Sequence, residues 1–287
     1  MPVVRPVQPM RVLAHAKLNL GLEVIGRRAD GYHDIVTIYQ SISLADEIVI
    51  YPADEFSYRP IAGIEPDTDL VSRSLALLRS RWHVALRASV IVEKRIPLAA
   101  GLGGSSADGA AVLRTIAGLA DISLGEVEAA GSELGSDVPF MIQGGTALGT
   151  GTGTTVDVIP TPVKASVVIV IPELDIPRKT ATLYRSLRED AFSDGSSTLA
   201  QAERLRRGDP IDAQLIANPF ITWLMQFPAF AEARSRLEAT SERPAHVSGA
   251  GPAIYTICRD WEEAKGIEAE MTPRGFRALS CRTVGRS

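Results

Sequence analysis

The sequence predicts an α+β protein of two domains. Alternating, β-branched segments dominate the first hundred of its 287 residues. Pro160-Thr161-Pro162 interrupts regular structure, because each proline fixes φ and removes a backbone donor. After these prolines, strand-like and helix-like segments alternate along the chain. The predicted domains are therefore residues 1–160 and 161–287.

Strands are expected where apolar residues alternate, and helices where they recur every three or four positions. Ser123 and Glu126 fit a capping box that begins one helix, and Gly135 suits the residue after its end. In the first domain we expect strands at 11–25, 35–50 and 88–92, helices at 69–82, 105–120 and 123–134, and a hairpin over 144–159. In the second we expect strands at 165–171, 253–258 and 276–284, and helices at 179–188, 197–207, 219–239 and 261–271.

Composition excludes several classes of protein. The chain has 30 Lys and Arg residues and 34 Asp and Glu residues. The resulting net charge of -4 gives no sign of a nucleic-acid-binding surface. No apolar run approaches the ~18 residues of a membrane helix, and no secretory signal is visible, so we expect no membrane partner. Cys258 and Cys281 are too few for a disulfide framework, which predicts buried free thiols in a reducing cytoplasm. The sequence does not choose between a monomer and a homodimer.

A glycine-rich segment leads directly into a predicted helix. Glycines let the backbone pass close to a ligand, and the free N–H groups of a helix start favour an anion such as phosphate. The hydroxyls of Ser105 and Ser106 can contact phosphate or magnesium, and the alternative is a plain turn with a serine N-cap. A Walker A lysine and a Rossmann βαβ pattern are both missing. The segment comprises Pro97, Leu98, Ala99, Ala100, Gly101, Leu102, Gly103, Gly104, Ser105, Ser106 and Ala107.

This segment resembles the phosphate-binding motif of the GHMP kinases. Ala16-Lys17-Leu18-Asn19-Leu20 resembles their N-terminal motif, and Val247-Ser248-Gly249-Ala250-Gly251-Pro252 resembles their C-terminal glycine loop. Within this superfamily, the segments 26–33, 134–140 and 144–147 resemble the 4-diphosphocytidyl-2-C-methyl-D-erythritol kinases. Ser105, Gly109 and Ala250 depart from common family residues but leave the glycine scaffold in place.

The resemblance implies a two-domain GHMP kinase fold. Its N-terminal domain would be like ribosomal protein S5 domain 2 and its C-terminal domain ferredoxin-like, with the site in the cleft between them. It implies ATP and Mg²⁺ as cofactors. The acceptor would be 4-diphosphocytidyl-2-C-methyl-D-erythritol, phosphorylated at its 2-hydroxyl in the methylerythritol phosphate route to isoprenoid precursors. The magnesium ligands are not assigned, although Ser106 is a candidate.

Three alternatives compete with this interpretation. Asp30-Gly31-Tyr32-His33 argues against another GHMP kinase, of homoserine or mevalonate type. Retention of Lys17 and Asp137 argues against a silent nucleotide-binding protein. The missing Rossmann pattern argues against a nicotinamide-dependent dehydrogenase.

The resemblance also assigns catalytic roles. Asp137 would be the base for the 2-hydroxyl, with a simple capping aspartate as the alternative. Lys17 would lie beside Asp137 and the hydroxyl, and would keep the carboxylate ionised; the alternative is a lysine on a solvated sheet face. Asn19 lies two residues further along the same strand, so its side chain faces the same way and is predicted to contact the acceptor.

Substrate-binding residues are predicted in three places. Tyr32 and His33 would bind the cytidine end of the acceptor, although such a pair in a turn can be structural. Thr180 and Tyr184 share one helix face and resemble a family segment whose aromatic ring packs on cytosine. Gly249, Ala250 and Gly251 would close the site near the diphosphate, unless they form a simple β-turn.

Overall fold

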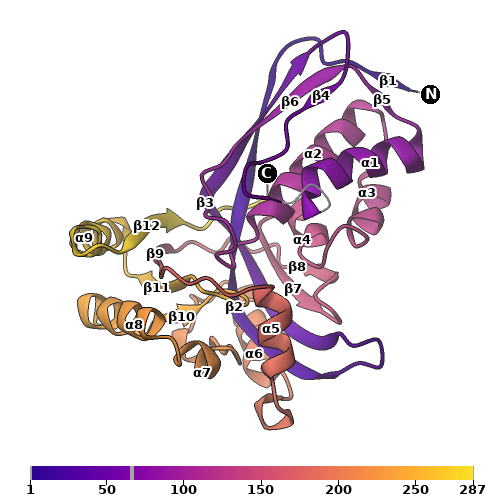
Figure 1. Cartoon of the computed structure of the whole chain (residues 1–287). Helices are drawn as coiled ribbons and strands as arrows, with labels where there is room; N and C mark the ends of the chain where they lie inside the picture. The colour runs from indigo at the N-terminus through magenta and orange to yellow at the C-terminus, as the bar shows by residue number, and fades with distance from the viewer. Residues whose placement is uncertain (1, 65–67, 287) are drawn as a thin grey trace. The chain divides into compact units, whose positions relative to one another are not determined.

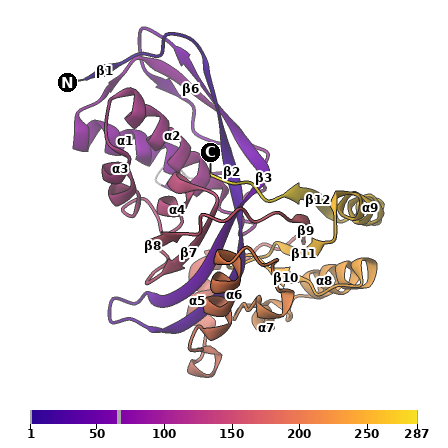
Figure 2. The ribbon, with the colours of Figure 1, turned by 180° about the vertical axis from the view of Figure 1, so that it is seen from behind.

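The structure is a computed structural model that describes residues 2–64 and 68–286. The chain divides into two compact units, shown from opposite sides in Figures 1 and 2. Unit 1 comprises Met1–Ala16, Leu44–Leu98 and Gly103–Gln143, and unit 2 comprises Lys17–Ser43, Ala99–Leu102 and Gly144–Ser287. The predicted boundary at residue 160 stays a prediction; these units divide the chain differently, because residues 17–43, 99–102 and 144–160 group with the C-terminal part.

Unit 1 is built from an antiparallel strand pair covered by helices. Strand β6 pairs with the second part of β3, so Ile48 lies opposite Val92 and Ile50 opposite Val90. Ile48, Ile50 and Val90 are buried with Leu113 and Ile116 in one core, and burying such a side chain stabilises by about 1.5–3 kcal/mol. Figure 1 shows the helices gathered on one side of these strands. The elements are β1 (Val3–Val4), β2 (Met10–Arg27, first part), β3 (His33–Pro52, second part), β4 (Ser57–Tyr58), α1 (Leu70–Trp82), β5 (Ala85–Leu86), β6 (Ala88–Glu93), α2 (Gly104–Leu119), α3 (Leu124–Gly131) and α4 (Val138–Gln143).

The helix ends of unit 1 follow local chemistry. The predicted capping box is confirmed, since the Ser123 hydroxyl accepts from Glu126 N and the Glu126 carboxylate accepts from Ser123 N. The predicted end of this helix is wrong: α3 stops at Gly131, and Leu134 N donates to Gly131 O three residues back. Gly135 N also donates to Gly131 O, over 3.4 Å, and these bonds form the turn that leads to α4. Gly135 therefore lies in this turn and not directly after the helix.

Unit 2 contains two antiparallel sheets. In the first, β3 pairs with β7 and β7 with β8, which confirms the predicted hairpin. The second has the strand order β10-β11-β9-β12, and Figure 2 shows α8 and α9 beside it. Val168, Val170 and Ile254 of this sheet share a core with Phe230 and Ile267 of the helices. The elements are the remaining parts of β2 and β3, β7 (Thr146–Thr150), β8 (Thr155–Val158), β9 (Ser166–Ile171), α5 (Lys179–Ser186), α6 (Ser196–Arg206), α7 (Ile221–Leu224), α8 (Pro228–Ser241), β10 (His246–Val247), β11 (Ile254–Cys258), α9 (Trp261–Met271) and β12 (Arg277–Arg282).

One predicted helix of unit 2 is two helices. The segment 219–239 is divided into α7 and α8, because Phe227 adopts an extended conformation with ψ 117° directly before Pro228. Cys258 and Cys281 are both buried, as predicted, and no disulfide joins them. Among the described residues, no helix has the length and apolarity needed to cross a bilayer.

Candidate active site

The glycine-rich segment forms a loop with three left-handed residues before α2. Ala99, Gly101 and Gly103 have φ values of 53°, 89° and 72°. Helix α2 begins at Gly104, and its N-cap Gly103 has no side chain to satisfy the first N–H groups. The alternative in which a serine caps this helix is therefore wrong. The open N–H groups and the positive end of the dipole suit an anion.

The loop packs against the second glycine loop, within unit 2. Ser248 Oγ donates to Gly101 O over 3.1 Å, and Ala253 N donates to Ala100 O over 2.9 Å. A methyl group on Gly101 would lie 2.8 Å from Gly251 O and would collide with Ser248 O. Glycine is thus required at position 101 by both its φ and the close approach of the two backbones.

Asn218 supports the second glycine loop. Its amide Nδ2 donates to Val247 O over 3.1 Å and to Gly249 O over 2.9 Å. Gly249 and Gly251 have positive φ values, 55° and 61°. Nothing local in the sequence shows that Asn218 holds a loop about 30 positions away.

Lys17 is a buried cation beside both loops. Its side chain is 4% exposed, which rules out the solvated-face alternative. Lys17 Nζ donates to Asn19 Oδ1 over 2.6 Å, so the prediction that these side chains share a face is confirmed. Lys17 N donates to Leu102 O over 2.9 Å, and a methyl group on Gly249 would lie 3.1 Å from Lys17 Nζ.

A hydrogen-bond chain fixes Asn19. Asn19 Nδ2 donates to Thr37 Oγ1, and Thr37 Oγ1 donates to Gly21 O, both over 2.7 Å. Tyr255 OH donates to Asn19 O over 2.7 Å. The amide oxygen of Asn19 is thereby turned toward Lys17. Thr37 and Tyr255 were not predicted, because their roles depend on pairing between distant segments.

Asp137 is a half-buried residue of unit 1 that directly precedes α4. Its backbone O accepts from Met141 N over 3.0 Å. Helix α4 begins at the next residue, Val138, and has Pro139 as its second residue. The predicted pairing of Asp137 with Lys17, which belongs to unit 2, stays a prediction.

An aromatic cluster in unit 2 contains two of the predicted cytidine residues. The His33 ring lies 5.2 Å from the Tyr184 ring and 6.1 Å from the Phe192 ring, and Tyr184 packs edge-on against Phe220 at 4.9 Å. His33 is 7% exposed, and its buried Nε2 has no hydrogen-bond partner among the described residues. Burial and the charge of Arg27 lower the pKa of His33, so the ring is neutral near pH 7. A buried, unpartnered ring nitrogen suits a hydrogen bond to a ligand.

Tyr32 and Thr180 lie outside this cluster. Tyr32 is 63% exposed, in a turn where its N donates to Asp30 Oδ1. Arg28 pairs with Asp30 and Asp34 and braces the same turn. Thr180 is an exposed residue in the first turn of α5. Their predicted binding roles stay predictions.

Unit 1 holds a buried ion cluster at the start and end of the phosphate loop. This cluster was not predicted from the sequence. Lys94 Nζ pairs with Asp46 and, over 2.6 Å, with Asp108, and neither carboxylate side chain is exposed. Asp46 also accepts from the N–H groups of Arg95 and Ile96, just before Pro97. Burial raises the pKa of the Asp108 carboxyl, and the charge of Lys94 opposes that rise. The cluster joins the strand before the loop to the helix after it.

A second missed lysine contacts the loop in unit 2. Lys179, the first residue of α5, donates from Nζ to Ala99 O. Burial and the charge of Lys17 lower the pKa of Lys179 to about 7. Lys179 is therefore near enough to Lys17 for their charges to repel.

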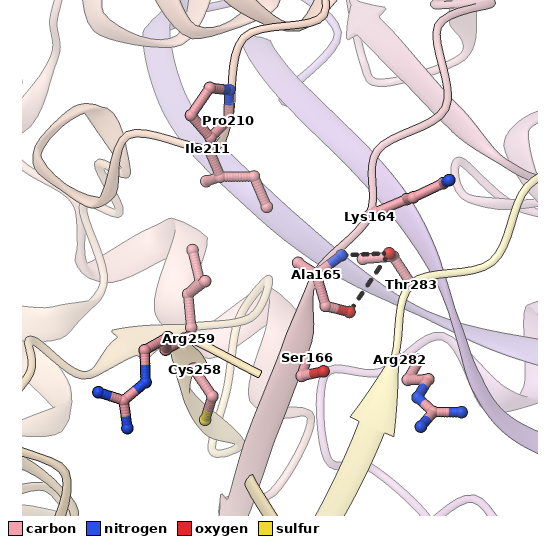
Figure 3. A pocket seen from close by; sticks show the side chains of 10 residues that line it. Lys164, Ala165, Ser166, Pro210, Ile211, Cys258, Arg259, Arg282 and Thr283 are labelled. Atoms are coloured by element: carbon pink, nitrogen blue, oxygen red, sulfur yellow. Dashed lines mark hydrogen bonds between the residues drawn. The ribbon is translucent and has the colours of Figure 1, made fainter. Parts of the chain in front are cut away.

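A surface hollow of about 460 Å³ lies elsewhere in unit 2 and contains none of the predicted site residues. Figure 3 shows the side chains of Lys164, Arg259 and Arg282 extending to different sides of it. The Arg282 guanidinium lies 4.2 Å from the Trp261 ring, and Arg259 contacts Asp260. The three positive charges do not converge on one point, so the hollow does not resemble an anion site.

Comparison with known proteins places this geometry in a family. Residues 69–145 match the model of the GHMP kinases N terminal domain. A 4-diphosphocytidyl-2-C-methyl-D-erythritol kinase of Dehalococcoides mccartyi is 36% identical over 96% of this chain and 99% of its own length. One of Moorella thermoacetica is 35% identical over 94% of this chain and 98% of its own.

Solved structures agree with the sequence comparison. A crystal structure of 4-(cytidine 5'-diphospho)-2C-methyl-D-erythritol kinase covers 96% of this chain and all of its own, at TM-score 0.80 and 31% identity. A homoserine kinase from Cytophaga hutchinsonii, at TM-score 0.69 and 14% identity, covers 97% of this chain and 95% of its own and shares the fold alone. The predicted GHMP kinase fold is thus confirmed, and the chain belongs to the 4-diphosphocytidyl-2-C-methyl-D-erythritol kinase family of the GHMP kinases.

Proposed function

We propose that this protein transfers the γ-phosphoryl group of ATP to the 2-hydroxyl of 4-diphosphocytidyl-2-C-methyl-D-erythritol, in the methylerythritol phosphate route to isoprenoid precursors. The observation that carries the proposal is the near-full-length similarity to kinases of this name at 36% identity. The buried Lys17–Asn19 pair beside two glycine loops supports it from the geometry.

The chemistry is an in-line displacement at phosphorus. The acceptor's 2-hydroxyl oxygen forms a bond to the γ-phosphorus, and the bond from that phosphorus to the β,γ-bridging oxygen breaks, releasing ADP. The hydroxyl proton passes to the Asp137 carboxylate. Lys17, oriented by Asn19, polarises the acceptor oxygen and stabilises its developing charge.

The two glycine loops supply backbone donors for phosphate. Residues 97–107 hold the ATP phosphates with the open N–H groups of α2. Gly249, Ala250 and Gly251, supported by Asn218, lie near the diphosphate of the acceptor. Glycines at these positions let backbone amides approach oxyanions without a side chain between them.

His33 and Tyr184 form the cytosine site in this proposal. Cytosine stacks on the Tyr184 ring, and the buried His33 Nε2 pairs with the edge of the base. In this proposal Tyr32 and Thr180 contact the outer part of the nucleotide. Because His33 is neutral near pH 7, base recognition by hydrogen bonding needs no proton uptake there.

Magnesium enters with ATP in this proposal. Among the residues that the structure describes, no three His, Cys, Asp or Glu side chains are grouped as metal ligands. The ion would be held mainly by phosphate oxygens, as Mg²⁺ commonly is, with the Ser106 hydroxyl as the candidate protein ligand. When bound, it supplies charge neutralisation on the β- and γ-phosphates.

The test is a panel of acceptors. Purified protein is incubated with ATP, MgCl₂ and either 4-diphosphocytidyl-2-C-methyl-D-erythritol, homoserine or mevalonate, and the product is followed by mass spectrometry and ³¹P NMR. We expect a phosphomonoester at the 2-position of the first acceptor alone. Phosphorylation of homoserine or mevalonate at a higher kcat/KM would contradict the proposal.

Variants of single residues test the assigned roles. Asp137→Ala is expected to lower kcat by about 10²–10⁴-fold, the usual worth of a positioned base, with an unchanged thermal midpoint. The control is Asp190→Ala, which removes an exposed carboxylate paired with Arg188. Near-normal turnover by Asp137→Ala would overturn the base assignment. His33→Ala is expected to raise the acceptor KM about tenfold while leaving the ATP KM unchanged.

A further inference from the structure

Lys179 is a second cation at the two glycine loops. Its Nζ donates to Ala99 O, at the start of the phosphate loop. Two residues later, Gly101 packs on Ser248 and Gly251 of the second loop, and Gly249 lies against Lys17 Nζ. Both lysines therefore lie within unit 2 against one pair of backbone loops. The positive charge of Lys17 contributes to the lowered pKa of Lys179.

Burial and the charge of Lys17 both disfavour the charged form of the Lys179 ammonium. The loops around them, residues 97–103 and 247–252, have no titratable side chain. Lys17 is the charged group that acts on Lys179, and Arg178, its neighbour in the chain, is exposed. Such a pair is relieved when an anion with two or more negative charges lies between the cations.

We propose that Lys179 is a phosphate-binding residue of this site, which contacts, together with Lys17, an oxyanion of a nucleoside di- or triphosphate. The inference rests on the proposed function, because it names a further residue for the same substrates. ATP and the cytidine diphosphate acceptor offer the same chemistry to Lys179. Nothing in the sequence singles out this residue, since a lysine at the start of an amphipathic helix is ordinary.

The alternative is that Lys179 has a purely structural role. Its bond to Ala99 O helps to hold a non-glycine residue at φ 53°. A lysine with a purely structural role would affect folding stability but would not exchange a proton when ligand binds. The two roles therefore differ in a measurable quantity, which is the number of protons taken up per ligand bound.

The sign of this proton linkage follows from the environment. In the free protein the pKa of Lys179 is about 7, and a bound phosphate oxyanion raises it toward its ordinary value of 10.5. Between these two values the complex holds more protons than the free protein. Binding at pH 8 therefore takes up protons, and affinity falls as the pH rises above 7.

The experiment is titration calorimetry on the full chain at pH 8, in two buffers of different ionisation enthalpy. One arm uses the ATP analogue AMP-PNP with Mg²⁺ and the other uses CDP, so that the two arms identify which substrate Lys179 contacts. We expect wild type to take up more protons per ligand than Lys179→Gln in at least one arm. In that arm, Lys179→Gln should bind about tenfold more weakly at pH 6.5, with the deficit shrinking toward pH 9.

Two further variants guard the conclusion. Lys179→Arg keeps a permanent charge, so it should bind the ligand but lose the additional proton uptake. Lys164→Gln removes an exposed lysine of unit 2 and should match wild type. Equal proton uptake by wild type, Lys179→Gln and Lys179→Arg in both arms would overturn the proposal, whatever the thermal midpoints show.

The acceptor panel separates this inference from the proposed function. Phosphorylation of the cytidine acceptor without Lys179-dependent proton uptake overturns the inference alone. Lys179-dependent uptake without turnover of that acceptor supports the inference and overturns the function. Failure of wild type to bind either probe overturns both.

Discussion

Two lysines contact the phosphate loop or its flanks in contrasting surroundings. Lys94, in unit 1, is enclosed by the carboxylates of Asp46 and Asp108. Lys179, in unit 2, donates to a backbone carbonyl and is repelled by Lys17. The first charge is paired with two carboxylates inside the protein, so its main expected effect is on stability. The second keeps its electrostatic potential for a ligand, which shows that the partners of a lysine, more than its burial, indicate its role.

Removing Lys94 is expected to have the largest effect, and it is an effect on stability. Lys94→Met leaves two buried carboxylates without a cation, which should lower the free energy of unfolding by about 3–5 kcal/mol near pH 8. Denaturant unfolding at several pH values measures it. The loss should shrink as the pH falls, because without Lys94 the folded-state pKa of Asp108 rises further. A carboxyl whose pKa is raised by folding contributes stability below its unfolded-state pKa. That contribution is lost as the pH rises through its folded-state pKa.

The double variant Lys94→Met/Asp108→Asn is the control for Lys94→Met. It removes one of the two stranded charges, so it should recover part of the lost stability. A loss below about 1 kcal/mol that does not change with pH would mean that Lys94 behaves as a surface lysine, and the contrast would fail.

Removing Lys17 is expected to act on turnover. Lys17→Ala should lower kcat by about 10²–10³-fold, the cost of losing one preorganised donor at a reacting oxygen, and should weaken acceptor binding. Steady-state kinetics with each substrate varied in turn measures both effects. If only the ATP KM changed, Lys17 would not lie at the acceptor hydroxyl. Lys164→Ala serves as the matched control.

Two glycines of the loop provide a matched pair. Gly101→Ala forces a side chain into φ +89° and against Ser248 O, so we expect a loss of about 1–3 kcal/mol and weaker nucleotide binding. Gly104→Ala lies at a helical position where a methyl would meet Ile96 Cγ2 at 3.0 Å. Gly104 does not have a positive φ, so its alanine variant should lose less stability than Gly101→Ala. Equal losses in thermal unfolding would show that the close approach at Gly101 is not the cause.

The smallest expected effect is at the capping box of α3. Ser123→Ala removes the acceptor for Glu126 N and should cost about 0.5–2 kcal/mol of stability. Kinetic constants should stay at wild-type values, and the variant gives a baseline for purely structural losses in unit 1. A clear change in KM for either substrate would show that α3 influences the site.

Local chemistry made much of the fold predictable. The Ser123 capping box and the alternation through β2 and β3 are encoded within a few residues of each other. The division at Phe227-Pro228 was also local, and the restriction that proline places on the preceding residue could have revealed it. The end of α3 could not be predicted from Gly135, because the helix stops at Gly131 and a hydrogen-bonded turn follows it.

Contacts between distant segments limited the prediction of the site. Lys17 and Asn19 were predictable because two residues separate them on one strand. Asp46 and Lys94 lie 48 positions apart, and no local pattern around either residue predicts their pairing. Lys179 was missed for the same reason. The family motifs predict two glycine loops and a base, but not Lys94 or Lys179, which contact the first loop or its flanks.

The sharing of β2 and β3 between units has a consequence for how this gene can be divided. Leu22, Val24 and Ile35 on these strands belong to the same apolar cluster as Val168 and the C-terminal helices. A polypeptide cut at residue 160 would leave those three side chains without their partners, in an N-terminal fragment prone to aggregate. Neither half can therefore be exchanged between relatives as a cassette. Recombination that keeps this apolar cluster intact must transfer residues 17–43 together with everything after Gly144.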